Sequence, residues 1–309
     1  MGQQHEDGWF PWFPGGGATT NTQGATARGL LKSYMVTGNQ AYLDAAVKTG
    51  DYLMSGALPE WADGSHRWAV HDPLFLEELS IVTGDPIYSD YVDTWLWQRL
   101  EAGDYGDSDW NTEDFAKFIV EGRLNMAGYD IGPLAIAAHL AGKAAIAEDL
   151  MEHGILYLIE KHFALAASWD VLGLAGAVYA SAVTGYDLNP TDGDLEAYNS
   201  TAELAALLAG WTTTDDQGAW LWRSDVDKGD LSNGDYQSTA FALKALAAIG
   251  DPAYDQQISD GIQFICSLQI VEDAEEHTGA FLRFYGDPDV PNVQGNGDAL
   301  AGIGVALGY

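Results

Sequence analysis

The sequence predicts an all-α fold, an α/α toroid in which a ring of inner helices is surrounded by outer ones. Six segments share an opening acid or amide and a closing glycine, and amphipathic stretches alternate with them. No alternating apolar and polar run is long enough for a major sheet. The 309 residues are 47% hydrophobic, enough for a large core, and we expect one domain over residues 1–309.

The six repeated segments are expected to form the inner helices. Asp and Gln suit a helix start, where a side-chain oxygen can cap unpaired backbone N–H groups. Glycine suits the end, because it adopts the left-handed C-cap conformation at little cost. Bodies rich in Ala, Gly and Leu allow close packing. The opening residues are Gln23, Asp72, Asp130, Asp170, Gln237 and Asp298, and the closing glycines are Gly38, Gly84, Gly142, Gly185, Gly250 and Gly308.

Between these segments lie stretches with apolar residues at helical spacing and charges on the opposite face, which predict an outer layer. In the first of them, Leu43 and Leu53 are expected to face inward, and Asp44 and Lys48 to face water. The last outer helix is expected to be absent, because the sequence stops at Tyr309. The outer stretches cover residues 41–54, 86–100, 143–162, 197–210 and 253–269.

The formal net charge of −33, from 46 acidic and 13 basic side chains, limits the expected partners. A field of this sign repels nucleic acid and anionic membranes, so neither is expected to bind. Hydrated carboxylates suit a secreted or salt-adapted protein, and we expect an extracellular location although residues 1–10 do not resemble a signal peptide. The single cysteine, Cys266, lies in an apolar run and is expected to be buried.

Two segments resemble known toroid families. Residues 215–269 combine Gly-Ala-Trp, Gln237 and an Ala/Leu-rich helix, and resemble the QW-type repeats of the terpenoid cyclase and prenyltransferase superfamily. Residues 17–54 resemble the opening hairpin of the toroid pectate lyases of polysaccharide lyase family ten. The first resemblance implies the toroid fold. Terpene chemistry is not expected, since the Asp-x-Asp-Asp of protonating cyclases is absent and one cysteine cannot complete a prenyltransferase zinc site.

In such a toroid the inner helices run parallel, so their N-terminal ends form one mouth. A concave mouth bearing carboxylates and aromatic rings is typical of a binding cleft. Taken singly, each aspartate is better explained as an N-cap, but their convergence favours ligand contact by at least two. The catalytic candidates are Asp72, Asp130, Asp170 and His71. The substrate-binding candidates are Arg67, Trp68, Tyr129, Trp169, Arg223, Tyr236, Gln237 and Asp298.

These candidates fit two kinds of sugar chemistry. Glycoside hydrolysis needs two carboxylates about 5–9 Å apart, which neighbouring positions on the ring could supply. β-Elimination of a uronate needs a base for the C5 proton and a cation for the sugar carboxylate, roles that suit His71 and the scarce arginines. His71 with no chemistry is an equally good interpretation. Tryptophans expected to stack on sugars are Trp9, Trp12, Trp68, Trp169, Trp220 and Trp222.

Long segments before inner helices are expected to form loops over the mouth, at residues 61–71, 103–128 and 220–237. Acidic clusters at residues 224–235 and 286–298 suggest calcium as a cofactor, although neither matches the EF-hand spacing. No side chains are assigned as metal ligands. The acidic and amide residues noted in these two clusters are Asp225, Asp227, Asp230, Asp235, Asp287, Asp289, Asn296 and Asp298.

The sequence therefore favours a secreted carbohydrate-active protein, a polysaccharide lyase or glycoside hydrolase whose partner is an oligo- or polysaccharide. The alternative is a non-catalytic extracellular binding or surface-assembly module with the same fold, and whether the chain is an enzyme stays open. An open groove with converging carboxylates or His71 would favour the enzyme. A mouth that is shallow, or covered by residues 9–17, would favour the binding module.

Overall fold

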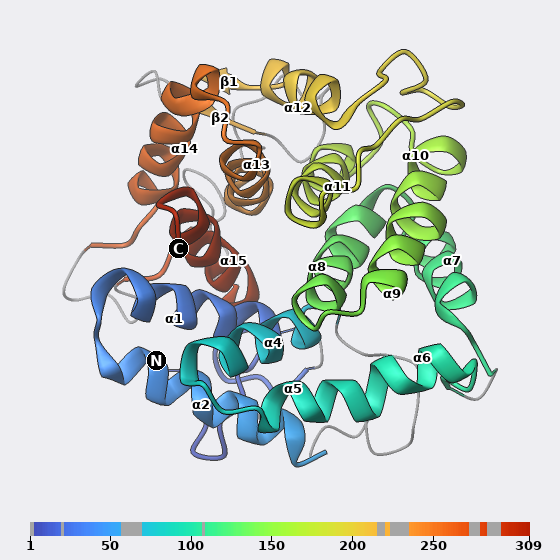
Figure 1. The fold of residues 1–309 in the computed structure, drawn as a ribbon. Coiled ribbons are helices and arrows are strands. Elements are labelled where there is room, and N and C mark those ends of the chain that lie inside the picture. The colour runs from blue at the N-terminus through green and yellow to red at the C-terminus, as the bar shows by residue number, and fades with distance from the viewer. Residues whose placement is uncertain are drawn as a thin grey trace.

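The computed structural model describes residues 3–19, 22–56, 70–106, 109–214, 220–222, 235–271, 279–282 and 292–309. Over these residues the fold is all-α, as the sequence predicts, with the helices arranged in a ring (Figure 1). The one sheet in the described chain has two short antiparallel strands, β1 (Thr213–Thr214) and β2 (Trp220–Leu221). No described helix is long and apolar enough to cross a membrane.

Six helices pack against one another in a closed order, each touching the next and the last touching the first (Figure 1). Their apolar bodies are buried on most sides and form the core. They coincide with the six segments expected to be inner helices, although two of them begin upstream of Asp130 and Asp298. In ring order they are α1 (Gln23–Thr37), α4 (Asp72–Thr83), α8 (Ala127–Leu140), α11 (Asp170–Thr184), α13 (Tyr236–Ile249) and α15 (Val293–Ala306).

Glycines set the close approach of these helices and their ends. A Cβ built on Gly132 of α8 would lie 2.6 Å from the carbonyl oxygen of Gly176 of α11, so only glycine fits at this crossing. The C-cap glycines of α1, α4, α11 and α13 have positive φ, as predicted from the sequence. Gly142 and Gly308 also have positive φ and follow one residue after the C-cap positions of α8 and α15.

Further helices lie against the outside of this ring (Figure 1). In α2, Leu53 is buried while Asp44 and Lys48 are exposed, as expected. Two of the outer helices contain a central π-helical segment, η1 or η3. The outer elements are α2 (Gln40–Met54), α5 (Ile87–Val92), η1 (Asp93–Trp97), α6 (Gln98–Ala102), α9 (Ala144–Asp149), η3 (Leu150–Leu156), α10 (Tyr157–Lys161), α12 (Thr201–Gly210), η5 (Pro252–Tyr254) and α14 (Asp255–Ser267).

The prediction of a long loop at residues 103–128 is wrong, because this segment contains α7 (Thr112–Arg123) and the 3₁₀ turn η2 (Leu124–Met126). Asn111 caps α7, its side chain accepting a hydrogen bond from the backbone N–H of Asp114. Phe115 and Ile119 are buried where α7 packs against η3 and α8. The loops expected at residues 61–71 and 220–237 lie largely outside the described residues.

Two further expectations about burial are wrong. Cys266 is exposed, because it lies on the outer face of α14 while Phe264 and Ile265 take the core positions. Trp222 is fully buried instead of lining a cleft, and its Nε1–H donates to the carbonyl oxygen of Leu208. Trp222 is therefore removed from the tryptophans expected to stack on sugars.

Candidate functional site

The N-terminal ends of the ring helices meet at one end of the molecule. The backbone N–H of Gly24 on α1 donates to Asp72 Oδ1 on α4 at 2.6 Å. His71, just before α4, packs against Tyr129 of α8, with ring centroids 4.3 Å apart and an interplanar angle of 51°. Gln237 of α13 donates to the carboxylate of Asp298 on α15. These contacts can form only if α1, α4, α8, α13 and α15 begin at the same end.

One hydrogen-bond network at this end centres on the hydroxyl of Tyr129. This hydroxyl donates to Asp298 Oδ2 at 2.9 Å and accepts from Gln294 Nε2 at 2.7 Å. Gln237 Nε2 lies 2.7 Å from Asp298 Oδ2 and 3.3 Å from the Tyr129 oxygen. We call His71, Tyr129, Gln237, Gln294 and Asp298 the Tyr129 cluster. Its members come from four helix starts that are far apart in sequence.

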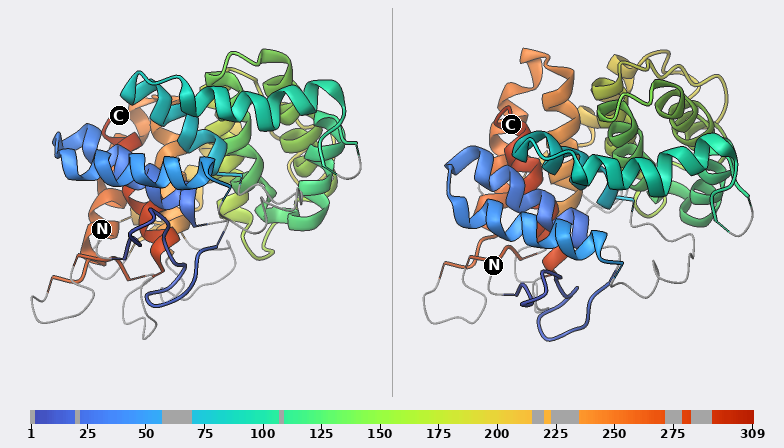
Figure 2. Two further views of the ribbon diagram at one scale, coloured as in Figure 1. Left: turned by 90° about the horizontal axis from the view of Figure 1, so that it is seen from below. Right: turned by 60° about the horizontal axis from the view of Figure 1, so that its bottom comes forward.

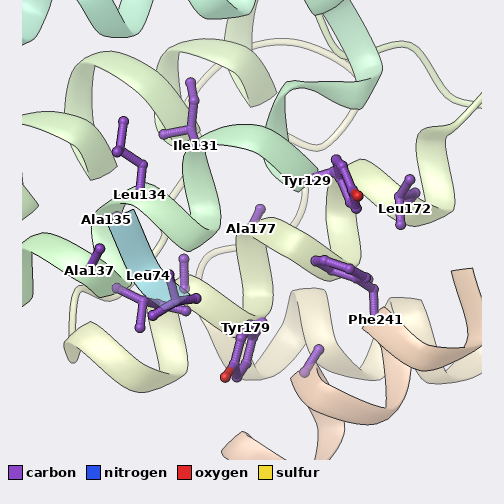
Figure 3. Packing of buried hydrophobic residues seen from close by; sticks show 14 of the residues in the cluster. Leu74, Tyr129, Ile131, Leu134, Ala135, Ala137, Leu172, Ala177, Tyr179 and Phe241 are labelled. Atoms are coloured by element: carbon purple, nitrogen blue, oxygen red, sulfur yellow. The ribbon is translucent and has the colours of Figure 1, made fainter. Parts of the chain in front are cut away.

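His71 supplies the unpaired nitrogen of this cluster. The side chain is 3% exposed, and Nε2 is buried without a hydrogen-bond partner. Tyr129 and Phe241, which lie near each other among the buried residues in Figure 3, both contact its ring. Burial, reinforced by the nearby charge of Lys244, holds the pKa of His71 well below its usual value. The imidazole is therefore neutral near pH 7.

Beneath the cluster lies a buried acid–base pair. Lys244 Nζ is 3.9 Å from Asp298 Oδ1, and the two side chains are 1% and 2% exposed. The same ammonium lies 3.8 Å from the centre of the Phe241 ring. Burial raises the pKa of Asp298 and lowers that of Lys244 to about 7, although each partner opposes the shift of the other. Burial thus favours the neutral form of both groups.

Deeper in the ring a second group of charged side chains is fully paired. Arg28 of α1 donates through Nε and Nη2 to the carboxylate of Glu78 on α4, at 2.8 and 2.9 Å, and also to the Tyr179 hydroxyl. Lys32 Nζ lies 3.1 Å from Glu78 Oε1. Burial would raise the pKa of Glu78, but Arg28 and Lys32 outweigh it and hold that pKa at about 2. We call Arg28, Lys32, Glu78 and Tyr179 the Arg28 cluster.

The three remaining catalytic candidates have hydrogen-bond partners outside the Tyr129 cluster. Asp72 is fully buried between α1 and α4, where Oδ2 has no partner and burial holds its pKa well above the usual value. Asp130 pairs with Arg123, with Nε and Oδ2 2.7 Å apart, yet burial raises its pKa to about 6. Asp170 accepts from the backbone N–H groups of Ala166 and Val171 and so holds the turn before α11.

The N-cap role expected of these aspartates is wrong, because other residues occupy the N-cap positions. His71, Met126, Trp169 and Asn292 precede α4, α8, α11 and α15, and Asp235 caps α13 by accepting from Gln237 N. Asp72 and Asp170 are the first residues of α4 and α11, whereas α8 and α15 begin three and five residues before Asp130 and Asp298. The carboxylates therefore point to neighbouring helices and turns instead of capping their own helix.

The structure brings together four predicted site residues, His71, Tyr129, Gln237 and Asp298. Trp169 is half-buried at a positive φ of 69° before α11, and Tyr236 is buried against Gly295 of α15. Sequence reasoning missed Gln294, Lys244 and the Arg28 cluster. The available signal was charged residues inside apolar helices expected to be buried. Arg67, Trp68, Arg223, Asp225, Asp227, Asp230, Asp287, Asp289 and the side chain of Trp220 lie outside the described residues.

The N-terminal segment lies across the starts of α1 and α15 (Figure 2). The Gln23 amide binds the backbone N–H and carbonyl of Phe10, both at 2.7 Å, so Gln23 anchors this segment. Val293 N donates to the carbonyl oxygen of Trp12 at 3.0 Å. Tyr129 beneath is 1% exposed, whereas Gln237 is half-buried. His71, Gln294 and Asp298 are buried as well, so Gln237 is the one partly exposed member of the cluster as the described residues form it.

No group of three or more His, Cys, Asp or Glu side chains that could hold a metal ion occurs in the part of the chain that the structure describes. Three residues of the expected calcium clusters are described and have protein partners, and those of Asp298 are Tyr129 and Gln237. Asp235 caps α13, and the Asn296 side chain binds the backbone of Phe281 and Asn292.

Comparison with known proteins identifies similar structures but no close relative. No family model matches the chain, and no curated protein matches its sequence. An inactive variant of the α-1,6-mannanase GH76A of Salegentibacter sp. HEL1_6, in complex with α-1,6-mannotetrose, is 12% identical with a TM-score of 0.62. That match covers 99% of this chain and 94% of the mannanase chain.

Two other solved structures are similar to the same extent. A glycosyl hydrolase of family 88 from Bacteroides vulgatus is 11% identical with a TM-score of 0.61, covering 98% of this chain and 93% of its own. A polysaccharide lyase is 13% identical with a TM-score of 0.58, and the match covers 94% of this chain and 90% of the lyase chain. Identities this low show the fold alone. The chain thus has the α/α toroid fold that these glycoside hydrolases and this lyase share.

Proposed function

We propose that the protein is a secreted enzyme that cleaves an oligo- or polysaccharide at the Tyr129 cluster. In this proposal α1, α4, α8, α11, α13 and α15 are the six inner helices of the toroid, and the substrate enters at their N-terminal ends. The similarity to glycoside hydrolases and a polysaccharide lyase supports a sugar substrate. The observation that carries the proposal is the buried, unpaired Nε2 of His71, whose ring contacts the ring of Tyr129.

The cluster supports β-elimination better than hydrolysis. Canonical glycoside hydrolysis uses a pair of carboxylates, whereas the Tyr129 cluster, as the described residues form it, contains one carboxylate, that of Asp298. Elimination instead needs one base that is unprotonated before the reaction, and the neutral imidazole of His71 has one unprotonated ring nitrogen near pH 7. In the proposed step His71 takes the C5 proton, a C4–C5 double bond forms, and the C4–O bond breaks. Gln237 donates to the sugar carboxylate, and Tyr129 protonates the departing oxygen.

The test is a panel of polysaccharides with two readouts. Polygalacturonate and alginate are followed by the ultraviolet absorbance of unsaturated products, and α-1,6-mannan by new reducing ends. We expect His71→Ala to lower the rate on the responding polymer at least 100-fold, because the base is lost. His139→Ala, an exposed histidine near the other end of α8, is the matched control and should stay within about twofold of wild type. Equal rates for both variants would remove His71 from the mechanism.

A non-catalytic binding or surface-assembly module is the second candidate. The burial of Tyr129 and Asp298 and the placement of the N-terminal segment over α1 and α15 favour it. This candidate predicts that the same polysaccharides bind without any product. It also predicts that His71→Ala leaves their affinity unchanged.

We also propose calcium as a ligand of the acidic stretches at residues 224–235 and 286–298, and an extracellular location. Both rest on the acidic composition. The resemblance of residues 17–54 to family-ten lyases stays a prediction. Secretion is tested by assaying the culture medium and the cell fraction of the producing organism with an antibody, and accumulation in the cell fraction would contradict it.

A further inference from the structure

Trp12 and Phe13 form an exposed aromatic surface on the N-terminal segment. Their side chains are 39% and 47% exposed. The two rings are almost parallel, with an interplanar angle of 2° and centroids 5.9 Å apart. We call this pair the Trp12–Phe13 platform. Two large apolar rings held side by side in water form a surface suited to a flat, partly apolar ligand.

Backbone hydrogen bonds fix the platform to the ring of helices. Phe10, two residues before Trp12, is buried and is held by the Gln23 amide at the start of α1. The Trp12 carbonyl oxygen accepts from Val293 N at the start of α15. Within the segment, Pro11 bridges to Ala18 and Gly16 N donates to the Phe13 carbonyl oxygen. The platform is thus attached on both sides, and little conformational entropy is lost when it binds a ligand.

The same contacts place the platform at the end of the ring that holds the Tyr129 cluster. Val293 bonds to Trp12, and the next residue, Gln294, donates to the Tyr129 hydroxyl. Figure 2 shows the N-terminal segment beside the first turn of α15 in both views. A polymer that reaches the cluster with one unit has neighbouring units at this rim.

We propose that the Trp12–Phe13 platform is an outer subsite that stacks against sugar rings of the polysaccharide whose reacting unit lies at His71. This proposal rests on the proposed function. Pyranose rings suit such a platform because one face of the ring is largely C–H, while the hydroxyl groups at its edge stay in water. Stacking of this kind needs no charge on the ligand, which matters in a chain with a net charge of −33.

The experiment measures affinity as a function of ligand length. Wild type is titrated calorimetrically with polygalacturonate, alginate and α-1,6-mannan, and then with the disaccharide and hexasaccharide of the polymer that binds. We expect the double variant Trp12→Ala, Phe13→Ala to bind the hexasaccharide at least tenfold more weakly and the disaccharide as tightly as wild type. The single variant Trp12→Phe keeps two rings at the platform, so it should bind the hexasaccharide with most of the affinity of wild type.

Trp95→Ala is the matched control, because Trp95 is also 47% exposed but lies on η1 in the outer layer. If the double variant and Trp95→Ala bind the hexasaccharide equally, the platform is no subsite, while binding by wild type still supports the proposed function. If wild type binds none of the three polymers, the proposed function fails and the subsite with it. If the double variant only abolishes a dimer in sedimentation, the platform joins copies of the chain, which overturns the proposal.

Discussion

Glu78 shows how the ring holds charge in its interior. Two cations, Arg28 and Lys32, surround its carboxylate at hydrogen-bonding distance, and the Arg28 pair is bidentate. Taking these groups out of water is costly, and their mutual attraction largely offsets the cost only while all partners are present. Removal of the single carboxylate leaves two buried cations without their shared partner.

We therefore predict that Glu78→Gln destabilises the protein by about 3–5 kcal/mol at pH 7. The folded-state pKa of about 2 lies below the unfolded value of 4.5, so the ion pair contributes fully above pH 4.5 and is lost as the pH falls toward 2. The difference between variant and wild type should accordingly shrink below pH 4.5. Urea unfolding at a series of pH values measures it.

Glu113→Gln is the control for this prediction. Glu113 also pairs with a lysine, Lys117, but on the solvent-facing side of α7. Its removal should leave the unfolding midpoint close to that of wild type at every pH. A Glu78→Gln variant as stable as Glu113→Gln at pH 7 would show that the buried pairs contribute nothing net to stability.

At the scale of elements, the contact between α8 and α11 depends on glycine. A Cβ on Gly132 would meet the carbonyl oxygen of Gly176 at 2.6 Å, and a backbone atom cannot move aside as a flexible side chain can. We predict that Gly132→Ala lowers the free energy of unfolding by about 1–3 kcal/mol, even though alanine is the better helix former.

Gly122→Ala on α7 separates these two effects. No atom lies within 4 Å of the Cβ built there, so only the helix preference changes, and we expect a gain of about 0.5–1 kcal/mol. Urea midpoints of the two variants should shift in opposite directions. A stabilised Gly132→Ala would mean that α8 and α11 are not in such close contact.

The elements predicted well are those with a strong local signal. An acid or amide, an apolar body and a closing glycine located all six ring helices, because buried helices repeat that pattern in sequence. α7 was missed because Glu113, Asp114, Lys117 and Glu121 give it a loop-like composition, while its burial comes from contacts with distant η3. The start of α15 was missed because the glycines at 295 and 297 suggest a loop, whereas here they allow close packing.

The candidate site was predictable to a depth of about one helical turn. His71, Tyr129 and Gln237 lie near helix starts, so parallel helices bring them together without further information. Lys244, Arg28 and Glu78 lie one or two turns further along, where the rotation of each helix decides what faces the interior. The rotation of each helix about its own axis depends on how it packs against its neighbours, and this packing is difficult to predict from a single sequence.

At the scale of the whole molecule, the large negative net charge affects the stability of the folded state. With a net charge of −33, the carboxylates repel one another over distances that salt shortens, because the Debye length falls from about 10 Å at 0.1 M to about 3 Å at 1 M. We predict that the melting temperature rises by about 4 °C between 0.1 and 1 M NaCl, equivalent to roughly 2 kcal/mol. KCl at the same concentration should act equally, as screening requires.

Calcium is tested in the same measurement. At matched ionic strength, 5 mM CaCl₂ should raise the melting temperature more than 5 mM MgCl₂, because large oxygen-ligand sites prefer Ca²⁺. Equal shifts for the two salts would contradict the proposed calcium site and leave only screening. A melting temperature that is independent of NaCl would contradict the screening argument.

The contact that closes the ring joins its first helix to its last, α1 to α15. On the ribosome α1 is synthesised more than 250 residues before α15, so the ring stays open until Val293–Ala306 has emerged. Until then α1 lacks its neighbour, and Tyr129 lacks the two side chains of α15 that hold its hydroxyl. Loop-closure entropy and long sequence separation make this final docking a slow step. The Tyr129 cluster is therefore assembled late, because it needs α15 in place.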